Sequence, residues 1–372
     1  RGVYRGKITL KRQYGIKARR LAYMFDNDLT ISDEILREAL GRSATARMRT
    51  IVNTIQREQN RAIRNDQDAR LLVEGAAGSG KTAVALHRVA YMLYKYRDML
   101  QSENILVFSP NRVFGDYISQ VLPDLGEENV PQMTFREFAE SFFAWRWEVQ
   151  TQVSFLEQLL GSSPVERDML LTRCSFKASP QFQKVLDRLV LLISDEAARF
   201  SDVYYGRKLL ISAADQTRMF STNYAYLPVQ KRMSKISQRI LHMLRPLKKK
   251  RVKQVFAALQ SDPAFEEESW WTRAREAVNR VRTELKPVFS LLREHYSVDC
   301  IAWYQRLWHD EGLWAEVACG LERPQGAEGS LRTLDDGVIA FEDAVPLLYL
   351  KGELEGYPVK RGIMHVVVDE IQ

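Results

Sequence analysis

The sequence is poor in the residues that build disulfide frameworks and metal sites. It contains three cysteines and five histidines, and no two cysteines form a C-x-x-C pair. An odd number of scattered cysteines argues against a disulfide framework and against a zinc site. We therefore expect reduced thiols and a cytoplasmic location.

Long apolar runs are also missing. No stretch of 18 apolar residues occurs, so we expect no membrane-spanning helix and no membrane partner. The first fifteen residues hold no apolar run that could serve as a signal peptide. They also lack an initiating methionine, and we therefore expect the chain to be a piece of a longer protein.

Acidic residues are absent between Asp215 and Asp262, although the net charge of the whole chain is only +7. This gap contains a basic segment, 231–256, with four consecutive cations at 248–251. Such a segment could bind nucleic acid or an acidic protein surface, and it could equally be the solvated face of a helix. The sequence leaves these alternatives open.

What the sequence does contain is an alternation of short apolar runs with helical patterns. The runs at 70–75, 104–110 and 365–370 are typical of buried strands, and the spacing of apolar residues at 81–96 and 111–126 predicts helices. Strands that alternate with helices predict a parallel sheet with right-handed crossovers. The predicted fold class is therefore α/β.

The apolar pattern divides the chain further. Residues 1–30 alternate polar and apolar positions, which predicts one or two strand hairpins, and helices are expected over 30–41 and 46–65. All seven tryptophans lie between Trp145 and Trp314, in a region of helical spacing. We predict four parts: an N-terminal segment, the first part of an α/β lobe, a mostly α-helical insertion with an aromatic core, and a return to the lobe, at 1–50, 51–145, 146–335 and 336–372.

The turn after the first apolar run has the sequence GAAGSGKT, which satisfies the pattern G-x-x-x-x-G-K-[ST]. A loop of this kind uses backbone N–H groups and a helix N-terminus to bind phosphates. Lys81 is expected to neutralise the β- and γ-phosphates, and the Thr82 hydroxyl to bind Mg²⁺. The predicted nucleotide-binding residues are Gly75, Ala76, Ala77, Gly78, Ser79, Gly80, Lys81 and Thr82.

The last residues, HVVVDEIQ, supply the acidic partner that a P-loop needs. We expect Val366–Val368 to be buried in the sheet, with Asp369 at its carboxyl end holding Mg²⁺. Glu370 would then orient and deprotonate the attacking water. The residues therefore predict a P-loop parallel sheet that binds a nucleotide and Mg²⁺.

The motif D-E-x-Q behind an upstream P-loop resembles the superfamily 1 helicases of the UvrD/Rep type. The resemblance implies that the parallel sheet is RecA-like and incomplete at Gln372 and that its nucleotide is ATP. It further implies that Gln372 reports the γ-phosphate to the rest of the motor. It also implies that Gln59, rather than Gln56, contacts adenine, and that Ser109 and Asn111 touch single-stranded nucleic acid. Arg136 stands where the family has a histidine, which puts that nucleic-acid contact in doubt.

Three longer stretches, TIVNTIQREQNRAIR, GSGKTAVALHRVAYMLY and SENILVFSPNRVFGDYISQVLPDLGEENV, resemble the HelD branch of these motors. HelD-type proteins use ATP to release RNA polymerase from nucleic acid, so the resemblance implies RNA polymerase core as the partner and the helical insertion as an arm. It also implies a second lobe beyond Gln372. Superfamily 1 ATPases hydrolyse ATP between two lobes, so residues 1–372 alone are expected to be inactive.

Two other functions remain open at this point. A DNA helicase of the UvrD/Rep kind would translocate on single-stranded DNA, so DNA or RNA is also a possible partner. A non-hydrolysing adaptor would bind RNA polymerase and keep the P-loop as a relic. Lys81, Thr82, Asp369 and Glu370 are all present, which argues against the adaptor.

Overall fold

The structure is a computed structural model. It describes residues 11–17, 20–27, 57–110, 122–123, 128–143, 146–324, 326–331, 334, 336–357 and 362–369. The chain divides into two compact units, Arg1–Phe138 with Val359–Gln372, and Ala139–Pro358. We call them the P-loop unit and the helical unit.

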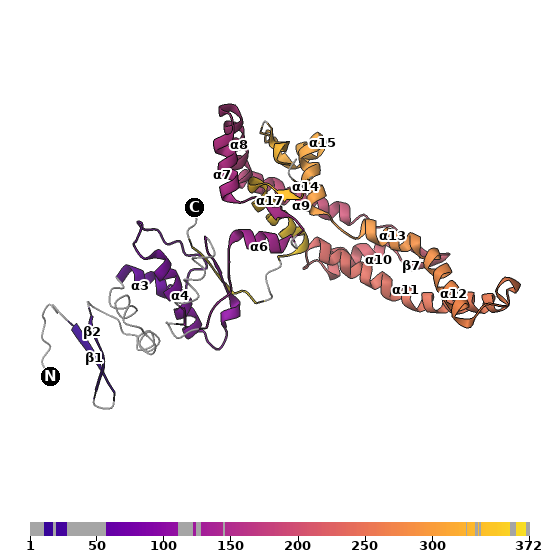
Figure 1. The fold of residues 1–372 in the computed structure, drawn as a ribbon, viewed down its shortest axis with the longest axis horizontal. Coiled ribbons are helices and arrows are strands. Elements are labelled where there is room, and N and C mark those ends of the chain that lie inside the picture. The colour runs from indigo at the N-terminus through magenta and orange to yellow at the C-terminus, as the bar shows by residue number, and fades with distance from the viewer. Residues whose placement is uncertain are drawn as a thin grey trace. The chain divides into compact units, whose positions relative to one another are not determined.

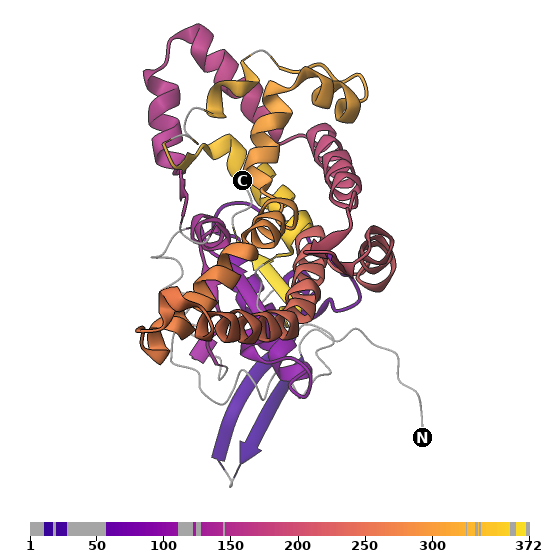
Figure 2. The same ribbon diagram turned by 90° about the vertical axis from the view of Figure 1, so that its right-hand side faces the viewer.

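The P-loop unit begins with a two-stranded antiparallel hairpin. Strand β1 (Lys11–Lys17) pairs with β2 (Arg20–Asn27), with Lys11 opposite Asn27 and a bulge between Gly15 and Ile16. Both strands are drawn in indigo in Figure 2. The hairpin predicted for this region is confirmed. The helix predicted at 30–41 lies outside the described residues, as does the helix predicted at 111–126 apart from residues 122 and 123, which are helical.

A small parallel sheet follows (Figure 1). Strand β3 (Ile105–Phe108) lies between β4 (Gln132–Met133) and β9 (His365–Val368), and both neighbours run parallel to it. Strand β9 is far from β3 in sequence, and Val107 pairs with Val367. The predicted parallel sheet and the strands predicted at 104–110 and 365–370 are confirmed.

The described helices of this unit are α3 (Arg57–Arg64), α4 (Lys81–Lys95), the 3-10 turn η1 (Ser102–Asn104) and α6 (Phe135–Phe142), which continues into the helical unit. The core gathers residues from α3, α4, β3 and β9. Its most buried members include Ile63, Val89, Ile105, Val107 and Val367. The buried face of α4 therefore packs on one face of the sheet and fixes the start of that helix near the strand ends.

Two strand predictions need correction. The run at 70–75 forms no strand, and Leu72 is 70% exposed. An apolar run becomes a buried strand only where neighbouring strands satisfy its backbone groups, and no described strand pairs with it. In β9 only Val367 is buried, while Val366 and Val368 are each 49% exposed, because alternate side chains of a strand point to opposite faces.

The helical unit is largely α-helical, as predicted. Its α-helices are α7 (Gln152–Gly161), α8 (Pro164–Lys177), α9 (Pro180–Ala197), α10 (Ala213–Arg218), α11 (Val229–Gln260), α12 (Trp270–Glu284), α13 (Lys286–His295), α14 (Cys300–His309), α15 (Glu311–Ala318) and α17 (Phe341–Glu355). Shorter elements are the π-helical turn η2 (Met219–Asn223), the 3-10 turns η3 (Pro263–Phe265) and η4 (Ala327–Leu331), and the strand pairs β5 (Glu148–Val149) with β8 (Val338–Ile339) and β6 (Val203–Tyr205) with β7 (Lys208–Ile211). Fold class is thus mixed α/β and mostly helical, with a small parallel sheet that is compatible with a RecA-like lobe.

The boundary between the units differs from the predicted one. The sequence predicts the helical insertion at 146–335 and the return to the α/β lobe at 336–372. In the structure α17 belongs to the helical unit, which spans Ala139–Pro358. Helix α17 packs on α8, α9 and α14, so its apolar face is buried by helices rather than by the sheet.

The core of the helical unit contains two of the tryptophans and a buried ion pair. Trp308 stacks on Trp314 with ring centroids 5.3 Å apart. Lys177 Nζ lies 2.6 Å from Asp343 Oδ1, and neither side chain is exposed. Tyr304 donates its hydroxyl proton to the same carboxylate oxygen at 2.6 Å, and burial together with this carboxylate raises the pKa of Tyr304. The predicted aromatic core is thus built around a charged contact.

Helices α11 and α12 form a long antiparallel pair, which Figure 1 shows side by side. Pro246 lies within α11, where it removes one backbone donor and favours a kink. At the start of α12, Trp270 is 54% exposed and Trp271 is 77% exposed, so these two tryptophans lie outside the core. Across the described ranges, no helix combines the length and the apolar character needed to cross a membrane.

Candidate active site

The P-loop joins residue 74 to the first turn of α4. Gly80 caps α4 with a left-handed backbone (φ 84°), and Gly78 also has a positive φ of 76°. Ser79 donates its backbone N–H to the Ala76 carbonyl at 3.2 Å, which closes the turn. Glycine adopts these conformations without the cost that a Cβ imposes, so the positions of Gly78 and Gly80 follow from the shape of the loop.

At Gly75 a steric constraint, rather than a positive φ, favours glycine. A Cβ placed there would lie 2.6 Å from the Ser79 hydroxyl oxygen, a separation that real Cβ atoms essentially never show. The loop therefore folds back on its own beginning. This compact turn stands directly before the N-terminus of α4, whose partial positive charge and free N–H groups favour an anion.

Lys81 is the first residue of α4, and its side chain folds over the loop. Its Nζ donates hydrogen bonds to the carbonyls of Gly75 at 2.9 Å and Ala76 at 3.0 Å. The loop carbonyls thus hold the ammonium group above the turn. A phosphate group entering the loop would meet a positive charge already placed at its rim.

Thr82 contacts Asp369, although 287 positions separate them in the sequence. The Thr82 hydroxyl lies 2.8 Å from Asp369 Oδ2 and 3.1 Å from Oδ1. Asp369 follows β9, and its backbone N–H donates to the Phe108 carbonyl at 3.1 Å, so the β3–β9 pairing fixes its position. The structure therefore brings the two predicted Mg²⁺ ligands together.

The chemistry of this pair fits a hard cation. Hydroxyl and carboxylate oxygens are ligands that Mg²⁺ accepts, and Mg²⁺ usually keeps several waters and binds substrate phosphates through its other positions. Within the described ranges, no group of three or more His, Cys, Asp or Glu side chains could hold a metal. Thr82 and Asp369 would leave a bound Mg²⁺ with positions for phosphate oxygens and water.

Gln59 lies beside the same loop. Its Nε2 donates to the Ser79 carbonyl at 3.0 Å, and a Cβ on Gly80 would come within 3.3 Å of that nitrogen. The predicted adenine contact is therefore adjacent to the predicted phosphate site. Gln56, the alternative, lies outside the described residues.

Helix α3, which carries Gln59, is fastened to α4 by contacts that sequence reasoning did not find. Arg88 donates to the Ala62 carbonyl at 3.0 Å, at the end of α3. Asp66 accepts hydrogen bonds from Lys95 and from Tyr96. These contacts lower the pKa of Asp66, and the contact with Asp66 raises the pKa of Lys95. Helix and strand periodicity do not relate residues that are 29 positions apart, so no sequence pattern predicts these contacts between α3 and α4.

Residues 55–139 match the family model of the UvrD/REP helicase N-terminal domain. The matched segment includes Gln59, the whole P-loop and β3, whereas Asp369 lies outside it. This similarity supports a superfamily 1 ATPase or helicase of the UvrD/REP type. A comparison with curated proteins found no match to the chain.

Of the remaining predicted site residues, one is buried and three lie outside the described residues. Ser109 is buried at the end of β3, with 5% exposure, and its backbone N–H donates to the Met133 carbonyl, so its side chain is not presented to a nucleic acid. Arg136 is exposed on α6. Asn111, Glu370 and Gln372 lie outside the described residues.

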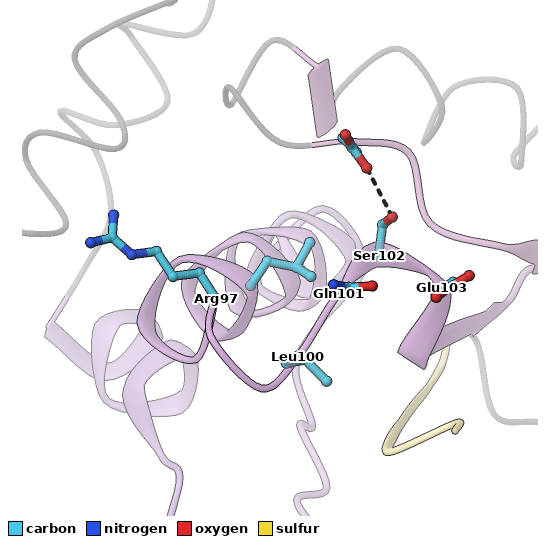
Figure 3. Close-up of a pocket in the computed structure, with 7 residues that line it drawn as sticks. Arg97, Leu100, Gln101, Ser102 and Glu103 are labelled. Carbon is cyan, nitrogen blue, oxygen red and sulfur yellow. Dashed lines mark hydrogen bonds between the residues drawn. The ribbon is translucent and has the colours of Figure 1, made fainter. Parts of the chain in front are cut away.

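A cavity of about 630 Å³ lies at the opposite end of α4 from the P-loop (Figure 3). It is lined by Leu93, Arg97, Leu100, Gln101, Ser102, Glu103 and Glu128. Ser102 donates to Glu128 at 3.2 Å across it. The cavity contains no P-loop residue and no Thr82 or Asp369, so it is separate from the candidate active site.

We predict that Gln59→Ala weakens ATP binding by about fivefold while GTP binding changes little, because one contact to adenine is worth on the order of 1 kcal/mol. Fluorescence titration with both nucleotides measures the ratio of the two affinities. Gln56→Ala is the matched control and should leave that ratio unchanged. An altered ratio in Gln56→Ala alone would transfer the adenine contact to Gln56.

Proposed function

We propose that the P-loop unit is the ATP-binding lobe of a superfamily 1 motor. The observation that supports this most strongly is the contact of Thr82 with Asp369, beside a glycine-rich loop that precedes a helix. The match of residues 55–139 to the UvrD/REP domain adds independent support. The proposed activity is ATP hydrolysis coupled to movement on or release of a macromolecule.

In this proposal each residue has a defined role. The loop N–H groups bind the phosphates, and Lys81 leaves the carbonyls of Gly75 and Ala76 to neutralise the β- and γ-phosphates. Thr82 and Asp369 hold Mg²⁺, which when bound neutralises charge on the phosphate oxygens. Glu370 orients and deprotonates the attacking water, Gln59 selects adenine, and Gln372 couples the γ-phosphate to movement.

We propose more specifically a HelD-like function in the cytoplasm, in which ATP drives the release of RNA polymerase core from nucleic acid. The resemblance of three stretches of the sequence to the HelD branch supports this. The helical unit would be the arm that enters the polymerase, and its paired helices α11 and α12 have the extended form that an arm requires.

Binding to RNA polymerase core tests this finer proposal. The chain of residues 1–372 and core polymerase should co-elute in size-exclusion chromatography at low salt, and added ATP should change the amount of complex. A Lys81→Ala chain should still co-elute but should not respond to ATP. Absence of co-elution at low salt would reject the HelD-like function without rejecting the ATP site.

A UvrD/Rep-like DNA helicase is the second candidate, and the family match at 55–139 favours it. It predicts single-strand binding that weakens or tightens with ATP and no specific affinity for polymerase. The third candidate, a non-hydrolysing adaptor, predicts polymerase binding without nucleotide binding. Parallel measurements of the three ligands on one protein preparation separate these candidates.

A further inference from the structure

Helix α11 carries an unusual charge distribution. Its 32 residues include ten lysines and arginines and no aspartate or glutamate. Two of the ten have structural partners: Arg232 donates to the carbonyls of Leu227 and Ala225 at 2.6 Å, and Arg251 pairs with Glu284 at 2.9 Å. These two cations stabilise the helical unit, and the other cations of α11 need a different explanation.

Six of the remaining cations form a row that we call the α11 stripe. They are exposed, and within the part of the chain that the structure describes none of them forms an ion pair or a side-chain hydrogen bond. The stripe consists of Lys231, Lys235, Arg239, Arg245, Lys249 and Lys253.

The stripe lies on the face of α11 opposite the core. With 3.6 residues per turn, its six positions fall within roughly a third of the helix circumference. The buried positions Met233, Ile236, Ile240 and Leu244 fall on the other side. The stripe is therefore continuous in solvent, and at 1.5 Å per residue it extends about 33 Å.

An unbalanced row of cations of this length is suited to an extended polyanion. A single surface lysine is well solvated and attracts anions only weakly. Like charges held in a row, however, repel one another and attract counterions. A nucleic-acid backbone presents phosphates at regular spacing and releases its condensed counterions when lysines replace them. Charge complementarity thus favours phosphodiester backbone over an apolar or mixed protein surface.

We propose that the α11 stripe is a nucleic-acid backbone site on the helical unit, distinct from the ATP site and from any contact made through Ser109 or Asn111. The stripe binds phosphates without reading bases. This goes beyond the proposed function, which assigns no role to the basic segment at 231–256, and it holds whichever motor activity the P-loop unit supports.

The exposed tryptophans mark where the site ends. Trp270 and Trp271 pack edge to face, with ring centroids 4.7 Å apart, and such rings could stack on bases. However, Glu266, Glu267 and Glu268 precede them, separated only by Ser269, and three carboxylates repel a phosphate backbone. The stripe therefore stops at Lys253, and base stacking at the tryptophan pair is not part of the site.

Fluorescence anisotropy with labelled 20-nucleotide single-stranded DNA and a 20-base-pair duplex tests the site in the 372-residue chain. The variant Lys235→Gln/Arg239→Gln/Lys249→Gln should bind at least about tenfold more weakly at 50 mM salt. The slope of log affinity against log salt should fall by about 2 for single strands. The control Lys184→Gln/Arg199→Gln/Arg293→Gln removes equal charge from exposed positions off α11 and should bind like the unaltered chain.

Three results would overturn the proposal. They are no binding of either nucleic acid at 50 mM salt, equal losses in the stripe variant and its control, or a tenfold loss in Trp271→Ala, which would move the site to the tryptophan pair. Stronger stripe-dependent binding of poly-glutamate than of both nucleic acids would also contradict it, because the partner would then be an acidic protein. Comparing the affinities for single-stranded and duplex DNA shows which backbone the stripe binds more tightly.

Discussion

Asp343→Ala is expected to destabilise the helical unit by about 3–5 kcal/mol. The substitution removes the carboxylate that lies 2.6 Å from the buried Lys177 ammonium group, and removing one partner of a buried ion pair costs this much because the other charge loses its counter-charge in the interior. Chemical denaturation followed by tryptophan fluorescence measures the loss, since Trp308 and Trp314 lie in the same core.

Two variants make this result specific. Glu353→Ala removes an exposed carboxylate from the same helix, α17, and should change stability by less than about 1 kcal/mol. Lys177→Met in the Asp343→Ala background should recover much of the loss, because replacing both charges removes the desolvation penalty. An Asp343→Ala chain as stable as the unaltered one, or a double variant no better than the single, would show that the ion pair is not buried.

Lys81→Ala is expected to weaken ATP binding by about 100-fold, the second large effect. The substitution removes the charge that the loop carbonyls hold at the phosphate site, and a charged contact in such a site is worth about 2–3 kcal/mol. Isothermal titration calorimetry of the 372-residue chain measures the affinity. Lys184→Ala, an exposed lysine of the helical unit, is the control and should bind ATP normally.

ATP turnover by residues 1–372 is expected to be negligible, because the family resemblance implies hydrolysis between two lobes. Robust ATPase activity of this chain that Lys81→Ala abolishes would contradict that expectation. Equal ATP affinity in Lys81→Ala and the unaltered chain would contradict the phosphate site itself.

The sequence predicted the secondary structure around the candidate site well. The pattern of Gly75–Thr82 predicted a turn before a helix, and α4 begins at Lys81 as expected. The apolar runs ILVF and HVVV became the neighbouring parallel strands β3 and β9. Asp369 lies at the carboxyl end of β9 as expected, and the structure places it beside Thr82 of α4.

Other features depended on contacts that no local pattern encodes. The run at 70–75 has the composition of a strand, but strand formation needs a neighbour, and no described strand provides one. The charges of Lys177 and Asp343 look like solvated surface charges in the sequence, yet they are 166 positions apart and fully buried. The contacts of Arg88 and Asp66 that hold α3 could not be predicted from the sequence either, because they form only when α3 and α4 pack together.

We propose that Thr82 and Asp369 belong to one magnesium–nucleotide site. The most direct measurement is ATP affinity in Mg²⁺ and in EDTA for the unaltered chain, Asp369→Asn and the exposed control Asp98→Asn. We predict that Mg²⁺ tightens ATP binding at least about tenfold in the unaltered chain and the control, and that Asp369→Asn loses this tightening while binding in EDTA is unchanged. Equal tightening by Mg²⁺ in Asp369→Asn would contradict the claim.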